Sequence, residues 1–409
     1  MRREGRRVQG NHITVELTLP NLVVERQTER GGTITVEVRS RCEERRCPRC
    51  GRATKQVHQY HDQLKQHKSL WGKRILLLLR KRRFRCTGCG KVFMERDEVC
   101  GWRRRYTKAL REYVAQESLT RTVRAVAGGE GVSEALVRRA FREMAHSKVD
   151  GVQTAPRTLA LDEVSVGPQQ GYLTVLYAPE KRQVVGLHQG RTQEAAEILL
   201  SGLAEGERVE AVVMDMTEPY RQAVHVCCPH AVIVADKFHM LRHVLAQVDR
   251  VRAEVQGRAK GKDAGLELFR RRSLFTADAQ VLDQDQRRDL ARLLRRYPKL
   301  ARAWRLAQQF RRFYRSGSRD EAAVNLHRWW ERVRTHGPRQ FLSLRHILTH
   351  WREEILNYFD HRLTNGFAEG KNNRIKVIIR SGYGYRNLEN LGLRILMTNY
   401  PSSYAAAPR

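Results

Sequence analysis

The spacing of apolar residues changes character several times along the chain. Apolar and polar residues alternate over residues 13–17 and 33–38, which is typical of strands, and the glycine pair at 31–32 predicts a hairpin. A further strand is predicted at residues 73–85, around an apolar run that lies between arginines. From residue 106 to about 146 the pattern is helical. The first third of the chain therefore predicts a strand-rich module followed by helices.

The remainder of the chain alternates differently. Strand-like apolar segments dominate residues 158–239, and one helical segment at 192–203 interrupts them. Residues 240–359 are helical in pattern and rich in arginine, and residues 401–409 are predicted to be a frayed tail. These patterns predict a multidomain α/β protein with a long helical segment near its C-terminal end.

The charge of the chain narrows the class of partner. The 409 residues include 77 Lys+Arg and 44 Asp+Glu, for a formal net charge of +33. So basic a surface attracts polyanions, which disfavours an ordinary metabolic enzyme and makes nucleic acid the first partner to consider, ahead of an anionic membrane. The length allows two to four domains at roughly 100–200 residues each.

The sequence predicts a cytoplasmic protein without a membrane partner. No apolar run approaches the ~20 residues that span a bilayer, and the densest run, residues 75–79, reads as a buried strand. The basic N-terminus has no apolar stretch after it, so a secretory signal is not expected. In a reducing compartment, the eight cysteines are expected to be metal ligands or core thiols rather than disulfides.

Two Cys-x-x-Cys pairs predict a structural zinc site. Four thiolates can surround one Zn²⁺ as a tetrahedron, and a glycine follows each pair, as expected for turns. The alternative is a pair of redox motifs, which would need a strand–helix context that the pattern lacks. The predicted ligands are Cys47, Cys50, Cys86 and Cys89. The other four cysteines, predicted to be buried or unpaired thiols, are Cys42, Cys100, Cys227 and Cys228.

Residues 122–141 have the layout of a helix-turn-helix. An apolar helix is followed by a glycine-rich turn and by Ser133, which is a suitable N-cap for a second helix. The alternative is an ordinary helical hairpin with solvated arginines. The apolar core is predicted from Val126, Val132, Leu136 and Val137. The arginines predicted to face DNA are Arg138, Arg139 and Arg142.

Three apolar strand-like segments each end in an aspartate. The three residues are Asp162, Asp215 and Asp236. Carboxylates at the ends of neighbouring strands can converge at one edge of a sheet and bind hard divalent cations. Two such ions about 3.5–4 Å apart can activate a water or a 3′-hydroxyl at a phosphodiester. The alternative is that these aspartates are solvated strand ends.

A polar segment at residues 364–376 holds a fourth acid. In a helix, Glu369, Asn373, Lys376 and Arg380 would share one face, which suits a metal site beside a phosphate backbone. The alternative is a surface ladder of salt bridges. Four tryptophans in the helical region are predicted to pack between helices, and stacking on a displaced base is the alternative. They are Trp304, Trp329, Trp330 and Trp351.

Taken in order, these motifs resemble the ISL-three family of bacterial insertion-sequence transposases. The likeness rests on Cys-Pro-x-Cys-Gly, Arg-Phe-x-Cys, the helix-turn-helix, Leu-Asp-Glu, Asp-Met-x-x-x-Tyr, Asp-Lys-Phe-His and Glu-Gly-x-Asn-x-x-Ile-Lys, and it covers residues 10–400. The resemblance implies a ribonuclease H-like mixed-sheet core, an Asp-Asp-Glu triad that holds two Mg²⁺, and an all-helical insertion before the third acid.

Carried onto this sequence, the resemblance makes Asp162, Asp215 and Glu369 the triad. Asp236 and His239 match the Asp-Lys-Phe-His motif and are expected to support the site, with Asp236 as the alternative second acid. Asp215 is preferred because the second acid follows the fourth strand in the ribonuclease H-like order. The three residues expected to contact DNA near the third acid are Asn373, Lys376 and Arg380.

The expected domains are an N-terminal strand and zinc module (residues 1–104), a helix-turn-helix (105–150), a first core part (155–240), a helical insertion (241–360), a last core part (361–400) and a tail (401–409). This layout predicts a DNA transposase of the bacterial cytoplasm, associated with the nucleoid. It would bind terminal inverted repeats and cut and join DNA. Because it must pair two ends, at least a dimer is expected. The alternatives are a regulator whose core is inert and a structure-selective nuclease.

Overall fold

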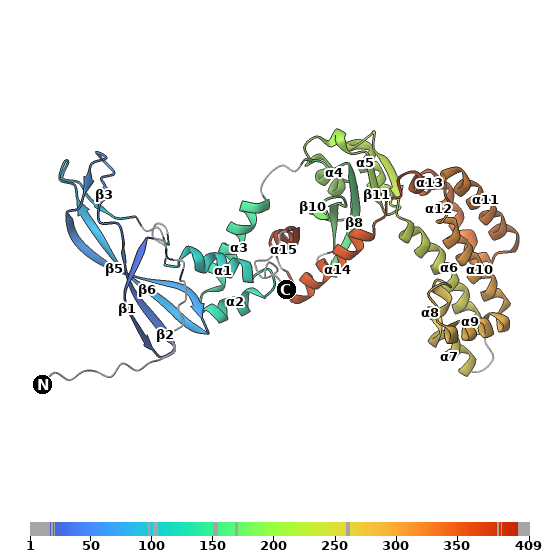
Figure 1. Cartoon of the computed structure of the whole chain (residues 1–409). Helices are drawn as coiled ribbons and strands as arrows, with labels where there is room; N and C mark the ends of the chain where they lie inside the picture. The colour runs from blue at the N-terminus through green and yellow to red at the C-terminus, as the bar shows by residue number, and fades with distance from the viewer. Residues whose placement is uncertain are drawn as a thin grey trace. The chain divides into compact units, whose positions relative to one another are not determined.

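The computed structural model describes Leu17, Leu19 and residues 21–96, 99–100, 105–149, 154–167, 171–258, 262–382, 384–385 and 387–399. These residues divide into two compact units, one up to Val149 and one from Thr154 onward (Figure 1). The predicted N-terminal strand at residues 13–17 and the predicted tail at 401–409 fall almost wholly outside the described residues. Each unit is described by itself.

A five-stranded sheet forms the first part of unit 1. Its strand order is β1-β2-β6-β5, and β7 pairs with β6. The turn between the first two strands lies at Gly31 and Gly32, as predicted, and both residues have positive φ. The strand before this turn begins at Leu22. Most of its residues are exposed, so its sequence shows no alternation of apolar and polar residues. The strands are β1 (Leu22–Arg30), β2 (Thr33–Ser40), β5 (Val57–Leu70), β6 (Lys73–Arg85) and β7 (Val92–Met94).

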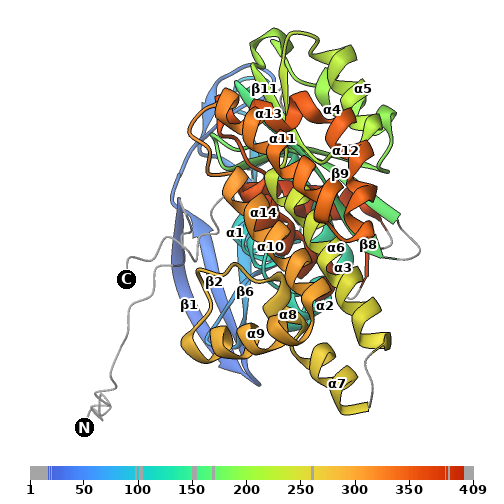
Figure 2. The same ribbon diagram turned by 90° about the vertical axis from the view of Figure 1, so that its right-hand side faces the viewer.

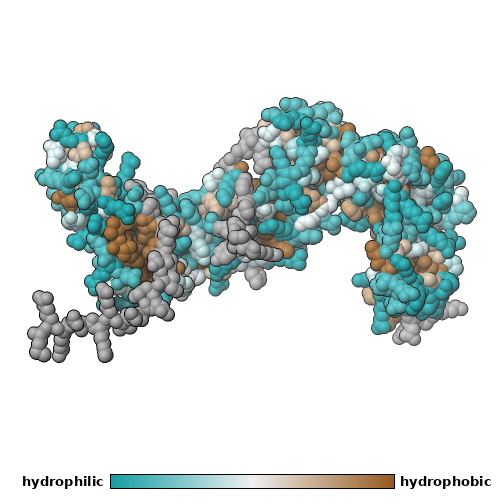
Figure 3. Space-filling model, viewed as in Figure 1, coloured by the Kyte–Doolittle hydropathy of each residue, from teal (hydrophilic) through white to brown (hydrophobic). Residues whose placement is uncertain are grey.

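The alternating strand β6 has the bounds that its sequence predicts. Ile75, Leu77 and Leu79 are buried together with Val36 and Val38 of the parallel neighbour β2. Burying one apolar face is what fixes the register of such a sheet. Figure 3 shows apolar residues gathered over this part of unit 1, on a surface that is otherwise largely hydrophilic.

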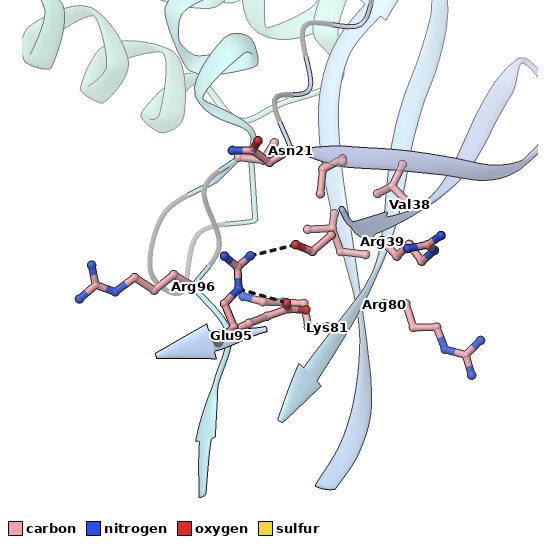
Figure 4. A pocket seen from close by; sticks show the side chains of 12 residues that line it. Asn21, Val38, Arg39, Arg80, Lys81, Glu95 and Arg96 are labelled. Atoms are coloured by element: carbon pink, nitrogen blue, oxygen red, sulfur yellow. Dashed lines mark hydrogen bonds and ion pairs between the residues drawn. The ribbon is translucent and has the colours of Figure 1, made fainter. Parts of the chain in front are cut away.

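One carboxylate ties the zinc-bearing loop to the sheet. The short strands β3 (Arg45–Arg46) and β4 (Ala53–Thr54) pair with each other. Arg45 donates to Ser40 Oγ at 2.8 Å and lies 3.8 Å from the buried carboxylate of Glu95, which also accepts from Arg82 at 2.9 Å. These groups line a small hollow, from which Arg80 and Arg96 extend outward (Figure 4).

Three helices complete unit 1, in the arrangement that the sequence predicts. They are α1 (Lys108–Glu117), α2 (Val123–Glu130) and α3 (Glu134–Val149). Ser133 caps α3 by accepting from the backbone N–H of Leu136 at 3.3 Å. Val126 and Val137 are buried in the core of the three helices, and Val132 packs against it. Leu136, predicted to belong to this core, is only half-buried and lies outside the cluster.

A second five-stranded sheet forms the centre of unit 2. Its strand order is β10-β9-β8-β11-β12, with β8, β11 and β12 parallel and β9 antiparallel to both of its neighbours. All four residues of β11 are buried, as expected for a strand covered on both faces. The strands are β8 (Thr158–Gly167), β9 (Gly171–Ala178), β10 (Gln183–Gln189), β11 (Ala211–Met214) and β12 (Val232–Ala235).

Helices cover both faces of this sheet. Gly186 and Leu187 are neighbours on β10 and therefore point to opposite faces. Gly186 lies against Leu199 of α4, whereas Leu187 lies against Gly392 of α15. The covering helices are α4 (Gln193–Ser201), α5 (Glu218–Cys227), α14 (Gly366–Ser381) and α15 (Leu388–Leu396). Helix α5 lies in a stretch that the pattern predicts as strand-rich, because only three of its ten residues are buried.

The arginine-rich segment is helical from Lys237 onward, three residues earlier than predicted. Helices α6 and α11 both pack against α10, and in Figure 2 the three helices lie in front of the sheet of unit 2. The helices are α6 (Lys237–Arg258), α7 (Lys262–Arg270), α8 (Arg272–Thr276), α9 (Gln284–Arg296), α10 (Pro298–Phe313), α11 (Arg319–His336), α12 (Arg345–His350) and α13 (Arg352–His361). In the part of the chain that the structure describes, no helix has the length and apolar character to cross a membrane.

The tryptophans of this segment pack between helices, as predicted. Trp329 is buried and donates from its indole nitrogen to the carbonyl oxygen of Leu306 at 2.8 Å. Trp351 is also buried, and the guanidinium of Arg221 lies 3.5 Å from the centre of its ring. Trp304 and Trp330 are partly buried against the same core.

Candidate metal centres and active site

The two Cys-x-x-Cys pairs come together in unit 1. Each second cysteine is followed by a glycine with positive φ, Gly51 and Gly90, and these turns aim the thiols inward. The sulfur atoms of Cys47, Cys50, Cys86 and Cys89 all lie within 4.8 Å of one another.

The thiols fit a tetrahedral zinc site. The sulfurs of Cys47 and Cys89 are 3.6 Å apart and those of Cys50 and Cys86 are 3.5 Å apart. Four sulfurs at about 2.3 Å from one zinc would be about 3.8 Å apart. Backbone N–H groups of Cys89 and Gly88 point at the Cys86 sulfur and lower the pKa of that thiol to about 6. These close pairs join different motifs, whereas a redox site would pair the cysteines of one motif.

The remaining four cysteines do not join this cluster. Cys100 and Cys228 are buried and Cys227 is half-buried, as predicted for core thiols. Cys42 is exposed, and its thiol lies 3.3 Å from the carbonyl oxygen of Glu44. The zinc ligands are therefore the four that the spacing predicts.

In unit 2, three aspartates stand side by side at the edge of the sheet. Leu161, Met214 and Ala235 are paired across the parallel strands β8, β11 and β12. The next residue is the aspartate in each case. Asp215 and Asp236 directly follow the ends of β11 and β12, as predicted, whereas Asp162 lies within β8, which continues to Gly167 because its later residues still pair with β9. The equal register of three parallel strands therefore brings the carboxylates to one edge, as the sequence predicts.

Burial and like charge act together on Asp162. Removal from water raises the pKa of its carboxyl to about 7, and the neighbouring carboxylate of Asp215 adds to this rise. Burial also raises the pKa of Asp236. A cation bound between these groups would relieve the repulsion, and carboxylate oxygens are the ligands that hard divalent cations prefer. The residues thus fit a divalent metal.

Asp215 and Asp236 have different surroundings. Both oxygens of Asp236 accept backbone N–H groups, one from His239 at 3.0 Å and the other from Asn365 at 3.1 Å. This carboxylate, which is 4% exposed, therefore joins the start of α6 to the start of α14. Asp215 has one oxygen 2.8 Å from His239 Nδ1 and is more exposed. Asp236 is thus held by the fold, while Asp215 can still bind a ligand.

Helix α14 brings the fourth acid to the same edge. Asn365, Glu369 and Asn372 lie four and three residues apart and therefore share one helical face. Asn365 Nδ2 lies 3.4 Å from the carbonyl oxygen of Leu161, and Asn372 Nδ2 donates to Asp162 at 2.8 Å. Glu369 lies between these two contacts along the helix, and its side chain is exposed.

The amide that reaches the acids is Asn372, whereas the sequence analysis placed Asn373 on the face of Glu369. Asn372 is buried and accepts a hydrogen bond from the hydroxyl of Tyr177 on β9, while Asn373 is exposed. The Asn365–Asn372 spacing of seven residues was the signal that could have identified it. Among the described residues, only the four cysteines gather three or more ligand atoms within 4.8 Å. The acids are therefore more widely spaced than the thiols.

The cationic residues predicted to contact DNA are all exposed. Arg138, Arg139 and Arg142 lie on α3, where Arg138 pairs with Glu134 at 2.6 Å. Lys376 and Arg380 lie on α14 beyond the acid site. Their exposure is compatible with phosphate contacts, and their role stays a prediction.

Three family models match successive parts of the chain. A model for the DDE transposase of ISL3 elements matches residues 159–395. A model for the zinc finger of the transposases of IS204, IS1001, IS1096 and IS1165 matches residues 43–89. A model for the helix-turn-helix domain of transposase family ISL3 matches residues 101–145.

Individual relatives agree with the models. The chain is 28% identical to the transposase for insertion sequence element IS1001 of Bordetella parapertussis, over 91% of this chain and 93% of that protein. It is 25% identical to the transposase for insertion sequence element IS1557 of Mycobacterium tuberculosis, over 59% of this chain and 60% of that protein. Since the first family model covers more than half of the chain and includes the acid site, this protein belongs to the ISL3 family of DDE transposases.

Proposed function

We propose that Asp162, Asp215 and Glu369 are the catalytic acids of this transposase and that they hold its divalent cations. The observation that carries the proposal is the equal register of the three aspartates at the edge of the sheet. Glu369 is supported by its place on α14 between two side chains that contact Leu161 and Asp162. Asp236 and His239 are assigned supporting roles, because Asp236 uses both oxygens on backbone amides.

The core of unit 2 is proposed to be ribonuclease H-like. In support, the sheet has the chain order third-second-first-fourth-fifth, and its second strand is antiparallel. Asp215 follows β11, which is the fourth strand of this sheet in chain order, and this favours Asp215 over Asp236 as the second acid. The proposed domains are residues 155–240, 241–360 and 361–400, and helices α6–α13 would form the insertion, with the first turn of α6 and the last residue of α13 lying just outside its bounds.

Unit 1 is proposed to recognise the terminal inverted repeats of the element. Helix α3 would lie in the major groove, with Arg138, Arg139 and Arg142 near phosphates or base edges. Asn373, Lys376 and Arg380 would contact the DNA backbone next to the acids. Because two ends are joined in one reaction, the working form is proposed to be at least a dimer, acting on DNA in the bacterial nucleoid.

The side chains of the site prepare an in-line exchange of phosphodiesters. Bound Mg²⁺ supplies positive charge to the reacting phosphate. Asn372 orients Asp162, and His239 orients Asp215. Water attacks the phosphorus at the element end, and the departing 3′-oxygen takes up a proton. The freed 3′-hydroxyl then attacks a target phosphodiester. One P–O bond forms for each that breaks, so the exchange needs no energy cofactor.

The test uses the zinc-loaded chain, Mg²⁺ or Mn²⁺, and DNA that carries both ends of its own element. A sequencing gel should show a metal-dependent 3′-hydroxyl at the repeat boundary and then a joined product. Asp162→Ala and Asp215→Ala should retain binding and lose at least about 10³-fold of the cleavage rate. Asp236→Asn is the matched control, and it should cleave measurably if it folds.

Each alternative has a distinct outcome. Binding without cleavage, by the unchanged chain with both metals, would favour the inert regulator. Cleavage without any joined product would favour the structure-selective nuclease. Full activity of Asp215→Ala combined with complete loss in Asp236→Asn would make Asp236 the second acid.

A further inference from the structure

The tip of the β5–β6 hairpin presents a tryptophan to solvent. Leu70 pairs with Lys73, so Trp71 and Gly72 form a two-residue turn, in which φ is +49° and +74°. Turns with positive φ at both residues favour Asn, Asp or Gly, and a bulky side chain in this conformation is uncommon. Trp71 is nevertheless 68% exposed and makes no ring contact with another described residue. Neither packing nor turn preference explains a tryptophan here.

Four hydrogen bonds fix this tip to the turn of the helix-turn-helix. The backbone N–H and the hydroxyl of Ser69 donate to the carboxylate of Glu130, at 2.9 and 2.6 Å. Gln66 donates to the carbonyl oxygen of Glu130 at 2.6 Å, and Arg74 donates to the carbonyl oxygen of Gly131 at 3.0 Å. The tip therefore cannot move independently of this turn.

The close approach of Arg74 depends on Gly131. This glycine has φ of +61°, and a Cβ built on it would lie 2.6 Å from a guanidinium nitrogen of Arg74. Only glycine combines that backbone conformation with that contact. Trp71 on the hairpin and Gly131 at the end of α2 thus lie on the two sides of one junction, and only Trp71 is unusual for its position.

The junction lies directly before α3. Glu130 is the last residue of α2, Gly131 ends it, and Ser133 caps α3. In a helix-turn-helix, the N-terminal residues of the second helix contact base edges. The hairpin tip is thus held next to the end of α3 that reaches the bases (Figure 1). Of the cations nearest to the tip in sequence, Lys73 pairs with Glu29 and Arg74 donates to Gly131, while Lys68 is half-buried.

We propose that the β5–β6 hairpin is a second DNA-contacting element, whose Trp71 packs against the sugars of the groove next to the one entered by α3. The ligand is the duplex of the element end, since the tip is hydrogen-bonded to the turn that precedes α3 and so continues the surface of the helix-turn-helix. The inference rests on DNA binding by α3. A β-ribbon can follow a DNA groove, and apolar side chains inserted in a minor groove contact sugars and base steps.

The test measures binding of the full-length, zinc-loaded chain to a labelled duplex that carries one end of its element. Trp71→Ala should weaken binding about tenfold, within the range measured for aromatic contacts with nucleic acid. Tyr60→Ala is the matched control: this ring is 53% exposed on the same hairpin but far from its tip, and its loss should change binding less than twofold. Trp71→Phe should restore most of the affinity.

Two further measurements separate this contact from general electrostatics. The slope of log affinity against log salt should be unchanged in Trp71→Ala, because that slope counts neutralised phosphates. The hydroxyl-radical footprint of Trp71→Ala should lose protection of the DNA sugars only on the side of the α3 site that the hairpin is proposed to cover. Equal affinity and an equal footprint for Trp71→Ala and the unchanged chain would overturn the proposal. Unaltered DNA binding with weakened self-association would show instead that Trp71 contacts a second copy.

Failure of the inference can be told from failure of DNA binding by α3. Arg139→Ala changes an exposed residue of α3 and should weaken binding whether or not the hairpin takes part. If Arg139→Ala weakens binding and Trp71→Ala does not, α3 binds DNA and the proposal that the hairpin contacts DNA is wrong. Zinc content and circular dichroism of each variant establish that unit 1 has folded.

Discussion

The two metal-binding regions of this chain are built in opposite ways. The thiols of unit 1 come from two short motifs, and their sulfurs cluster within 4.8 Å. The acids of unit 2 come from the middle of one strand, the ends of two others and one helix, separated by up to 207 positions from Asp162 to Glu369. Their cluster is wider, and amide and imidazole groups hold it. A closed sulfur site can stabilise a fold, whereas an open oxygen site leaves room for a substrate.

The two sites can also be compared by the pKa values of their ligands when no metal is bound. Near the thiols, backbone N–H groups lower the pKa of Cys86 to about 6. The pKa of Cys50 rises to about 11 despite the backbone N–H of Arg52, because the sulfurs of Cys86 and Cys89 lie beside it. Near the acids, burial and the charge of Asp215 disfavour the charged form of Asp162. Both sites thus retain a repulsion that a metal ion or a proton can relieve, and at the zinc site backbone N–H groups offset part of it.

The largest expected effect comes from removing one thiolate. Cys50→Ser should abolish tight zinc binding and unfold the loop that carries it, because structural zinc contributes on the order of 10 kcal/mol to folding. Zinc content, measured by mass spectrometry, should fall from one ion per chain to none, and DNA binding should fall with it.

Cys42→Ser is the control for that experiment, since Cys42 is exposed and lies outside the cluster. Its zinc content and DNA binding should not change. Retention of zinc in Cys50→Ser would show that the site does not need four sulfurs, and the contrast between the two metal centres would weaken.

A smaller effect is expected from the amide that holds the first acid. Asn372→Leu removes the hydrogen bond to Asp162 and should lower the cleavage rate about tenfold, while DNA binding is kept. Asn373→Leu changes an exposed neighbour and should keep the cleavage rate at saturating DNA. Equal losses in both variants would show that Asn372 does not orient the acid.

The smallest expected effect concerns stability and pH. Because the folded chain raises the pKa of Asp162 to about 7, it binds the proton more tightly than the unfolded chain does. The corresponding stability is complete below about pH 4, where the carboxyl is protonated in both states, and is lost as pH rises towards 7. Asp215→Asn removes the neighbouring charge, so it should stabilise the metal-free chain by about 1 kcal/mol at pH 8.

Urea unfolding at pH 4 and pH 8, followed by the fluorescence of the buried tryptophans of unit 2, measures this difference. The stabilisation of Asp215→Asn should be present at pH 8 and nearly absent at pH 4. Excess Mg²⁺ should shrink the advantage of the variant, since metal relieves the same repulsion in the unchanged chain. A destabilised variant at pH 8 would mean that the contact between Asp215 and the His239 ring outweighs the repulsion between the carboxylates.

The sequence predicted elements wherever one face is buried. Strand β6 was found with its bounds, because Ile75, Leu77 and Leu79 alternate towards the core. Its partner β5 was missed, since most of its N-terminal half is exposed and polar. Helix α5 was missed for a related reason, as only Tyr220, Ala223 and Val224 of its ten residues are buried. Local patterns record burial, and exposed elements leave little pattern.

The site was predictable to the extent that it follows strands. Apolar segments that end in aspartate indicated the three residues, and parallel pairing then set them in register. The role of Asn372 could not be derived in the same way. Its selection over Asn373 depends on how α14 is rotated against β8, which is a tertiary property. The hairpin tip beside Glu130 depends likewise on contacts between residues more than 60 positions apart.

The position of Asp236 also affects how the helical segment of this protein can evolve. Its two oxygens accept hydrogen bonds from the first turn of α6 and from Asn365 at the start of α14, which lies 129 positions after Asp236. The helical segment therefore begins and ends beside the same carboxylate. Because the two ends of the helical segment lie close together, the helices between them can be lengthened, shortened or exchanged while the strands keep their spacing. A lineage could thus alter its helical segment without redesigning its chemistry.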